Sequence, residues 1–425
     1  MTAALAICGG VRTPFVRSFG ALLGVKVDDL ARAVFVETID RVGVDPSTID
    51  EVILGCAGQP VHAMNVARVA ALRAGVPPSV PAVTVHRNCA SGVEAIGAGL
   101  RRVRAGEADV LLVGGAEAMS DAPFHLVRSA NHKLLRAFNT KGTLAKLARL
   151  WKLRLKELVP RDTLRPALTD PISGLIMGDT AEVLAREHAI SREAQDAYAA
   201  ESQRRAAAAR ERGVFRQESM ALPVPPRFDR LVEEDDGIRP DATAEKLARL
   251  RPVFDRRFGS VTVGNACQIT DGAAALLVAS EDGASRAGLP VLGWVRDVMT
   301  VGCDPRRMGL GPAWVIPKLL QKHALGADDV ALLEINEAFA VQVLACLDAM
   351  PELTIPRDRL NVNGGAIGLG HPVGATGIRI VLTLLLELRR RGARYGVASL
   401  CVGGGQGAAV LVENPDHGAP KEDPT

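Results

Sequence analysis

Two cysteines far apart in the chain suggest covalent chemistry on a carbonyl group. Cys89 lies in VHRNCASGVEA and Cys401 in SLCVGGGQGAA. Asn336, in EINEAF, and His371, in NGGAIGLGHPVGATG, lie between them in the sequence. A thiolate attacks carbonyl carbons readily, and a second thiol beside it can carry a proton. Few other reactions need such a pair, so the four residues predict acyl transfer to and from a thioester.

Cys89 is expected on the first turn of a helix. Asn88 is a good N-cap residue, and the Ala-rich segment 89–104 favours a helix. Free backbone N–H groups and the helix dipole at that position favour the thiolate form. The alternative is a small buried residue at a tight strand-to-helix turn.

Cys401 is expected at the end of a strand, directly before three glycines. The glycines should leave its sulfur exposed at a sheet edge with a near-neutral pKa, so that it can give and take a proton. The alternative is a small residue that fills a strand end.

His371 and Asn336 complete the candidate set. The glycines around His371 indicate a close backbone approach to another segment or to a bulky substrate, and a core histidine is the alternative. Asn336 could orient a water or an oxyanion, or could cap a turn. A dinucleotide loop does not fit, because Val373 stands where its third glycine would be and GGGQG at 403–407 leads into a strand-like segment.

The same order of elements is predicted near both ends of the chain. The first set consists of strands over 51–55, 82–85 and 109–113 and a helix over 89–104. The second set consists of strands over 330–335, 360–363 and 395–401 and a helix over 374–391. The offset of about 280 residues indicates a duplicated α/β unit. We expect two mixed sheets with helices between and outside them, in layers α/β/α/β/α, and sites at the strand ends.

Composition excludes several classes of protein. The chain has 425 residues, of which 48% are hydrophobic, enough for two cores. Its net charge of +3 does not suggest a nucleic-acid partner. The seven cysteines show no CxxC spacing, so we expect no disulfide framework, no metal site and a reducing cytoplasm. No leader peptide and no membrane span are expected, which leaves surface attachment open.

A segment that does not repeat lies between the two sets. His125 to Lys156 contains nine Lys or Arg and no Asp or Glu. Apolar residues recur there at helical spacing and predict an amphipathic helix: Leu144, Leu147, Leu150, Trp151 and Leu155. A long charged helical stretch is expected over 179–212 and a loop over 225–258.

These expectations divide the chain into five parts. The N-terminal half comprises 1–119 and 259–289, and a loop domain with the basic helical insertion occupies 120–258. The C-terminal half comprises 290–414. Residues 415–425 are expected to be a disordered tail.

The motifs together resemble those of the thiolase family, in the family's order and over nearly the whole chain. They are GVRTPF, NCASG, GGAEAMS, MGDTAE, TDGAAA, NEAF, GGAIGLGHPVGATG and CVGGGQG. The last two are highly specific and NCASG moderately so.

The resemblance implies a mechanism for cleaving 3-oxoacyl-CoA. Cys89 attacks the 3-keto carbonyl with help from His371 and becomes an acyl-enzyme. Cys401 protonates the departing acetyl-CoA carbanion and then deprotonates the incoming CoA. His371 with a water held by Asn336 forms one oxyanion site, and the backbone N–H groups of Cys89 and Gly403 form the other. Coenzyme A is a substrate, and no permanent cofactor or metal is implied.

Two further residues concern the binding of coenzyme A. By resemblance, Met177 lines the tunnel for the pantetheine arm. Cys267 stands where thiolases often have serine, and Ile176 stands where short-chain biosynthetic members have histidine. Cys267 thus lacks the hydroxyl that would contact the pantetheine arm. Ile176 favours a more apolar tunnel, and with it the degradative direction.

Several functions and partners stay open at this point. The leading one is a 3-ketoacyl-CoA thiolase of fatty-acid β-oxidation, and the alternatives are a biosynthetic acetoacetyl-CoA thiolase and a non-catalytic acyl-CoA-binding or scaffold subunit. The insertion resembles that of thiolase β-subunits, whose partner is a hydratase/dehydrogenase α-subunit, although those relatives often have histidine at position 336. The basic segment 125–156 could be a solvated face, could bind an anionic membrane peripherally, or could dock a partner subunit or CoA phosphates. The family implies a homodimer or tetramer.

Overall fold

The computed structural model describes residues 3–418. Nine strands form one continuous sheet path in the order β10-β11-β12-β9-β1-β8-β5-β3-β4, and β2 (Val16–Arg17) pairs with β8 beside it. The strands of the first half are β1 (Leu5–Arg12), β3 (Glu51–Gly55), β4 (Ala82–Val85), β5 (Val110–Glu117) and β8 (Thr270–Ala279). Those of the second half are β9 (Gly293–Gly302), β10 (Val330–Ile335), β11 (Tyr395–Val402) and β12 (Gln406–Glu413).

The strand order confirms the predicted duplication. In the first half β3 runs parallel to β5, β5 antiparallel to β8, and β8 antiparallel to β1. In the second half β10, β11, β12 and β9 repeat these pairings in the same order. The halves join where β1 pairs antiparallel with β9.

The predicted strand over 360–363 is wrong. Leu360 makes a single parallel bridge to Leu333 of β10, at the place that β4 occupies beside β3. Asn361 then has a φ of 46° and Gly364 a φ of 76°. Left-handed backbone cannot continue an extended strand, so this strand is reduced to one bridge.

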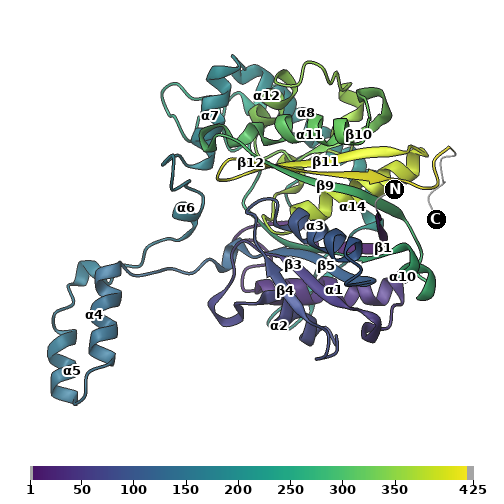
Figure 1. Cartoon of the computed structure of the whole chain (residues 1–425). Coiled ribbons are helices and arrows are strands. Elements are labelled where there is room, and N and C mark those ends of the chain that lie inside the picture. Colours follow the sequence, from purple (N-terminus) through teal and green to yellow (C-terminus); the bar gives the residue numbers. More distant parts are fainter. Residues whose placement is uncertain (1–2, 419–425) are drawn as a thin grey trace.

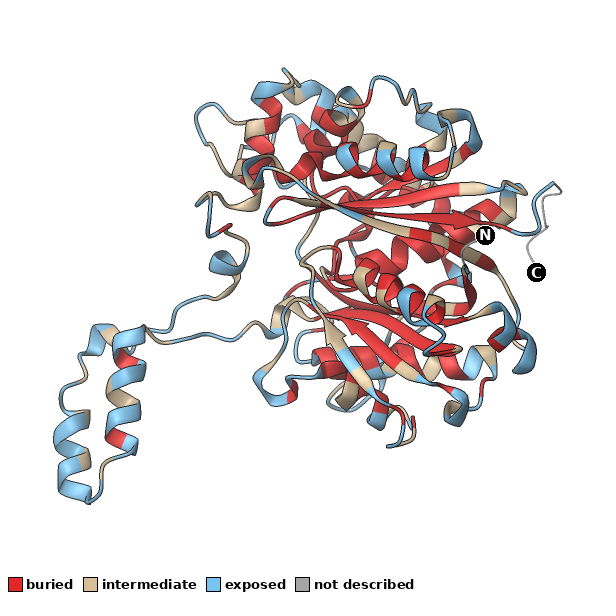
Figure 2. Ribbon diagram, viewed as in Figure 1, coloured by how far each residue is buried: buried red, intermediate tan, exposed pale blue. Residues whose placement is uncertain are grey.

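The two predicted sheets are halves of one continuous sheet, and two helices lie between these halves and give the layered architecture that the sequence predicts (Figure 1). These are α3 (Ser91–Arg104) and α14 (Thr376–Arg391), whose apolar side chains share one core with both halves of the sheet. This central layer is almost entirely buried (Figure 2). The helix α14 ends at Gly392, whose left-handed φ of 61° suits a C-cap glycine.

The outer layers cover the remaining faces of the two halves of the sheet. On the first half these are α1 (Val27–Val42) and α2 (Val66–Arg73), and on the second α11 (Gly311–Lys322) and α12 (Ala340–Asp348) (Figure 1). The other regular elements are α6 (Leu164–Ala167), α7 (Met177–Glu187), α8 (Arg192–Glu211), β6 (Leu222–Val224), β7 (Arg230–Val232), α9 (Ala244–Leu247) and α10 (Glu281–Arg286).

The helical stretch predicted over 179–212 is two helices. It breaks between α7 and α8, where Ala189 has a φ of 49° and the Ser191 side chain accepts the N–H of Ala194 as an N-cap. The region predicted as loop, 225–258, is mostly loop, with short β7 and α9 inside it.

The basic insertion forms a helical hairpin that stands out from the body (Figure 1). It consists of α4 (Arg128–Phe138) and α5 (Thr143–Leu150), and the chain then forms a 3-10 helix over Leu155–Glu157. The apolar positions predicted on one helix are therefore divided, because α5 ends at Leu150 with Trp151 as its C-cap. No described helix is long and apolar enough to cross a membrane.

The end of the described chain is folded as far as residue 418. Residues 415–418 form a turn in which the N–H of Gly418 donates to the carbonyl of Gly392 at 2.9 Å. The rest of the tail predicted over 415–425 lies outside the described residues.

Candidate active site

Cys89 lies in a tight turn two residues before α3. The helix begins at Ser91 with Ala90 as N-cap, so the N-cap role predicted for Asn88 is wrong. Asn88 instead has a left-handed φ of 44°, and its Nδ2 donates to the carbonyl of Gly403 at 2.7 Å. The Ser91 hydroxyl donates to the carbonyl of Asn88 at 2.7 Å and closes the turn. Asn88 thus ties the Cys89 turn to the loop after β11.

The thiol of Cys89 is not a preformed thiolate, which corrects the expectation from the helix dipole. Burial raises its pKa, and the nearby carboxylate of Glu117 adds to this effect. The N–H groups of Gly403 and of Cys89 itself act in the opposite direction by hydrogen bonding to the sulfur. Because desolvation outweighs these two donors, Cys89 needs a base to take its proton.

His371 has a ring nitrogen that its hydrogen bonding leaves able to accept a proton. Its Nδ1 lies 2.6 Å from the Thr376 hydroxyl, which itself donates to the carbonyl of Pro372 at 2.9 Å. The hydroxyl donates its only hydrogen to Pro372, so it can only accept a hydrogen from Nδ1. Nδ1 therefore carries the hydrogen of the neutral ring, and Nε2 has none. Nε2 is buried and has no hydrogen-bond partner among residues 3–418. Burial, and then the charge of Arg379, lower the His371 pKa to about 3, so the ring is neutral.

Glycines bring the Cys89 turn and the His371 loop together. A Cβ on Gly92 of α3 would lie 2.9 Å from both the Gly374 carbonyl oxygen and the Ile378 nitrogen. A Cβ on Gly377 of α14 would lie 2.5 Å from the Val93 nitrogen. The two helix starts therefore cross backbone to backbone, which only glycine permits at these positions.

Asn336 lies directly after β10, beside β11. Its N–H donates to the carbonyl of Ser399 at 2.9 Å. Both polar atoms of its side chain are buried, and neither has a hydrogen-bond partner within the described part of the chain. A buried amide that is not paired by protein is typical of a position that holds a water or a substrate atom.

Cys401 lies inside the sheet, which corrects the expectation of an exposed thiol. It lies on β11, between β10 and β12, where it pairs with Gly407 of β12, and it is 1% exposed. Burial raises its pKa well above the ordinary value, and the neighbouring Cys89 adds to the shift. Cys401 is therefore a neutral thiol that can donate a proton, rather than a titrating group near neutral pH.

Met177 and Cys267 lie in the same neighbourhood. The Sδ of Met177, at the start of α7, would be 3.3 Å from a Cβ on Gly403. The N–H of Cys267 donates to the carbonyl of Ala338 at 3.0 Å. Burial, and then the charge of Cys89, raise the pKa of the Cys267 thiol to about 12, which places a third thiol beside Cys89.

The segment around Cys267 also joins the remaining candidates. Ala266 forms a bridge with Phe339, in the loop after Asn336, and Ile269 forms a parallel bridge with His371. The structure thus brings all seven predicted positions to one region where strand ends and helix starts meet.

Glu117, at the end of β5, was missed as a site residue. Its carboxylate accepts the N–H groups of Ala57 at 3.1 Å, Gly58 at 2.7 Å and Gly374 at 2.9 Å. Burial raises its pKa to about 7. It therefore joins the loop after β3 to the loop of His371. The available signal was an acidic residue inside the apolar run LLVGGAEA.

Thr376 was missed as well. Its only signal was its place five residues after His371, at the start of the predicted helix.

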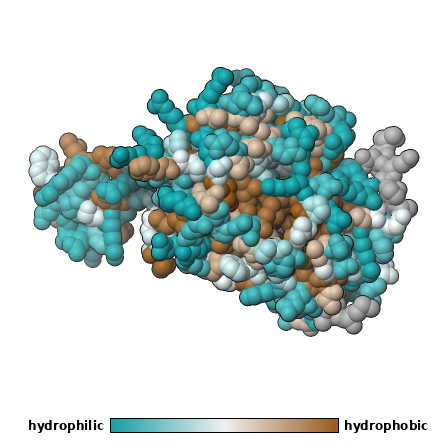
Figure 3. Space-filling model, turned by 90° about the horizontal axis from the view of Figure 1, so that it is seen from above, coloured by the Kyte–Doolittle hydropathy of each residue, from teal (hydrophilic) through white to brown (hydrophobic). Residues whose placement is uncertain are grey.

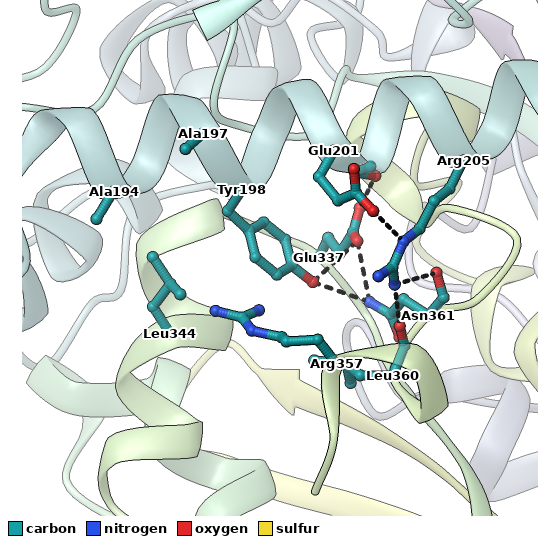
Figure 4. Close-up of a pocket in the computed structure, with 11 residues that line it drawn as sticks. Ala194, Ala197, Tyr198, Glu201, Arg205, Glu337, Leu344, Arg357, Leu360 and Asn361 are labelled. Carbon is teal, nitrogen blue, oxygen red and sulfur yellow. Dashed lines mark hydrogen bonds and ion pairs between the residues drawn. The ribbon is translucent and has the colours of Figure 1, made fainter.

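A separate cavity of about 460 Å³ lies beside α8, and none of the seven predicted residues lines it (Figure 4). On one wall, buried Glu337 accepts hydrogen bonds from Tyr198 at 3.0 Å, Ser202 at 2.6 Å and Asn361 at 2.9 Å. These bonds hold the chain immediately after Asn336, so the network fixes the loop that carries this amide.

The comparisons agree with this geometry. The protein-family model described as "Thiolase, N-terminal domain" matches residues 5–282, and the family model described as "Thiolase, C-terminal domain" matches residues 289–414. The chain is 42% identical to a beta-ketoadipyl-CoA thiolase of Pseudomonas aeruginosa, over 96% of this chain and 98% of that protein. It is 39% identical to an acetyl-CoA acetyltransferase of Chromobacterium violaceum, over 97% of this chain and the full length of that protein.

A solved structure is similar over the same length. The human mitochondrial 3-ketoacyl-CoA thiolase in complex with CoA has a TM-score of 0.87 and 37% identity, over 97% of this chain and 98% of that one. The sequence, the fold and the proximity of two thiols to a neutral histidine all support the same family assignment. The chain belongs to the thiolase family and is an acyltransferase.

Proposed function

We propose that the chain cleaves 3-oxoacyl-CoA with coenzyme A, giving acetyl-CoA and a shortened acyl-CoA. The observation that carries the proposal is the surroundings of the Cys89 sulfur. Two backbone N–H groups reach this sulfur, and a buried neutral thiol, Cys401, lies beside it. These are the groups that a covalent acyl transfer with a carbanion leaving group needs.

The first half-reaction forms the acyl-enzyme. His371 Nε2 takes the proton of the Cys89 thiol, and the sulfur adds to C3 of the substrate. The C2–C3 bond then breaks, and Cys401 gives its proton to C2 of the leaving acetyl-CoA. The acyl group stays on Cys89 as a thioester.

The second half-reaction releases the acyl group. Cys401, now a thiolate, takes the proton of the CoA thiol, and the CoA sulfur attacks the thioester carbonyl. Cys89 leaves as a thiolate and recovers its proton from His371. Both thiols end in their starting state.

Negative charge forms on two oxygens, which need separate donors. The oxygen on the carbon bound to Cys89 lies next to the N–H groups of Cys89 and Gly403. The enolate oxygen of acetyl-CoA is assigned to His371 and a water held by the unpaired amide of Asn336. Loss of one such donor typically lowers the rate by about 10²–10³-fold.

The substrate is proposed to be a fatty-acid β-oxidation intermediate. Ile176 and Cys267 make an apolar environment for the pantetheine arm and acyl chain, together with Met177. The printed names of the relatives also include a beta-ketoadipyl-CoA thiolase and an acetyl-CoA acetyltransferase. A dicarboxylic 3-oxoacyl group or the synthesis of acetoacetyl-CoA from two acetyl-CoA would follow the same steps.

We further propose a homodimer that pairs through β4. This strand is the edge of the sheet, and it is only partly buried, with Val83 37% exposed. Exposed apolar residues lie on the segment before it, namely Val61, Met64 and Leu72. An open apolar edge is the kind of surface that a second copy covers. Light scattering of the wild type and of Val83→Lys tests this, since the substitution should yield monomers.

A cytoplasmic location and a hydratase/dehydrogenase α-subunit as partner complete the proposal. Fractionation of cells and co-purification with the tagged chain test these two points. If the chain is recovered from the cytoplasm without another subunit, the proposal of an α-subunit partner is refuted.

The central experiment measures thiolysis rates with 3-oxoacyl-CoA substrates from four to sixteen carbons and with 3-oxoadipyl-CoA. Cys89→Ala and Cys401→Ala are assayed in parallel, and both should lose turnover. Trapping with a radiolabelled acyl-CoA should label the wild type on Cys89 alone. Full activity in either variant would refute the two-thiol mechanism, and a preference for four carbons or for 3-oxoadipyl-CoA would refute the fatty-acid substrate.

A further inference from the structure

The helical hairpin of residues 125–156 has an outward surface that no other part of residues 3–418 covers. Its neck is closed by a pair of backbone hydrogen bonds between His125 and Arg161, at 3.0 and 2.8 Å. Within α4 only Ala130 and Ala137 are buried, and α5 has no buried residue within the described chain. Most of the hairpin is coloured as exposed, with half-buried positions such as Leu134 and Leu150 between the two helices' exposed faces (Figure 2).

The large exposed side chains form an apolar stripe along α5. Leu144, Leu147 and Trp151 stand three and four residues apart, on one face of the helix, and are 84%, 57% and 91% exposed. Leu135 and Phe138 of α4 are also exposed, as is Leu155. Apolar side chains of this size and number are costly to leave in water.

Basic residues accompany the stripe. Lys133 is paired with Glu157 at 2.7 Å. The other eight cations of the segment form no ion pair with any residue of 3–418; they are Arg128, Arg136, Lys141, Lys146, Arg149, Lys152, Arg154 and Lys156. The space-filling view shows hydrophobic residues among hydrophilic ones on the protruding hairpin (Figure 3).

We propose that this hairpin docks on an anionic lipid bilayer, with Leu144, Leu147 and Trp151 at the boundary between headgroups and acyl chains. A stripe of leucine and tryptophan flanked by unpaired lysine and arginine is suited to that boundary. Positive charge with no acidic residue from His125 to Lys156 is complementary to anionic headgroups. This attachment is independent of the proposed thiolysis, since it uses no residue of the active site.

The other partners explain fewer of these observations. A solvated basic face does not require a stripe of exposed leucine and tryptophan. Binding of CoA phosphates requires cations but no apolar surface. A protein partner could cover both features, and the test below separates it from a bilayer because only purified chain and vesicles are present.

The test is co-sedimentation of the full chain with vesicles of phosphatidylcholine alone and with vesicles that include phosphatidylglycerol. One variant neutralises Lys146, Arg149, Lys152 and Arg154 to Gln, and another changes Leu144, Leu147 and Trp151 to Ser. The matched control neutralises four exposed cations of the body, Lys26, Arg216, Arg306 and Lys318, to Gln. Thiolysis of a short substrate in solution, equal in all four proteins, shows that each is folded.

We expect the wild type and the control to bind anionic vesicles and to be released by salt. The charge variant should bind about 600-fold more weakly, since each of the four neutralised cations contributes on the order of a fivefold gain and the four factors multiply. The apolar variant should also lose binding. Tryptophan emission should shift to the blue on binding, and Trp151→Phe should abolish the shift.

Two results would overturn the inference. One is a wild type that stays in solution with anionic vesicles, which would indicate a solvated face or a protein partner. The other is equal sedimentation of the wild type and both hairpin variants. Either result with normal thiolysis would leave the proposed function standing, whereas vesicle binding without thiolysis would refute the function alone.

Discussion

His371 Nδ1 and the Thr376 hydroxyl lie 2.6 Å apart, and this hydrogen bond decides which nitrogen of the ring is free to act as a base. Thr376 is the second residue of this pair because α14 begins there, with its hydroxyl turned back to the carbonyl of Pro372. The first residue of α14 thus determines which tautomer His371 adopts.

Replacing Thr376 by Val should lower kcat about tenfold to a hundredfold and change KM little. The ring loses the acceptor for Nδ1–H, so the tautomer with a free Nε2 is no longer favoured. Steady-state thiolysis kinetics measure the effect. Thr376→Ser keeps the hydroxyl and should retain most of the activity; a Val variant as active as the Ser variant would contradict the assignment.

Asn336→Ala should lower kcat by about 10²–10³-fold without loss of stability. The amide makes no side-chain hydrogen bond with a described residue, so folding gives up little when it is removed. Urea denaturation and kinetics are measured together.

The matched control for Asn336 is Asn265→Ala. Asn265 is also buried, but its side chain bonds to Thr262, Asp196 and Ser260. Its removal should cost about 1–3 kcal/mol of the free energy of unfolding. A destabilised but fully active Asn336→Ala would show that the amide is structural.

Gly92→Ala should destabilise the protein and reduce activity. The added Cβ would lie 2.9 Å from the Gly374 carbonyl and the Ile378 nitrogen, which are backbone atoms and cannot turn away. The helices must separate, at a cost of about 1–3 kcal/mol in the free energy of unfolding. Gly302→Ala is the control, because a Cβ there meets no atom within 4 Å. Equal thermal stability of the two variants would contradict the tight crossing.

Glu117 should make the free energy of unfolding decrease as the pH rises. Its pKa rises from an ordinary 4.5 to about 7 on folding, so the folded state binds the proton more tightly. The free energy of unfolding therefore falls as the pH rises from about 4.5 to 7, by up to about 3 kcal/mol from this group. Glu117→Gln should remove that decrease, as urea denaturation at a series of pH values can show. An unchanged slope in the variant would assign the dependence to another group.

His371 should make the free energy of unfolding increase as the pH rises, which is opposite to the effect of Glu117. Its pKa falls from an ordinary 6.5 to about 3 on folding, so stability is lost as the pH drops below about 6.5. His371→Asn should therefore resist acid better than the wild type between about pH 6 and 4. The same series of denaturation curves measures this, and a variant more sensitive to acid would refute a buried neutral ring.

Local sequence was sufficient for most of the elements and for naming the candidate reacting groups. The predicted strands over 51–55, 82–85 and 330–335 coincide with β3, β4 and β10, because runs of β-branched and apolar residues favour buried strands wherever they occur. Residue type and motif single out Cys89, Cys401 and His371 as candidates, since the chemistry predicted for them belongs to the side chain itself.

The state of those groups was decided by tertiary structure. Cys89 and Cys401 were expected to titrate readily, but burial raises both pKa values, and desolvation depends on segments hundreds of residues away. The strand expected over 360–363 failed for a reason that no local pattern shows, the left-handed turn at Asn361. Glu117 gained its role only when folding brought Gly58 and Gly374 to its carboxylate. Residue type alone names the atoms that are able to react, whereas their protonation and alignment come from the contacts that folding creates.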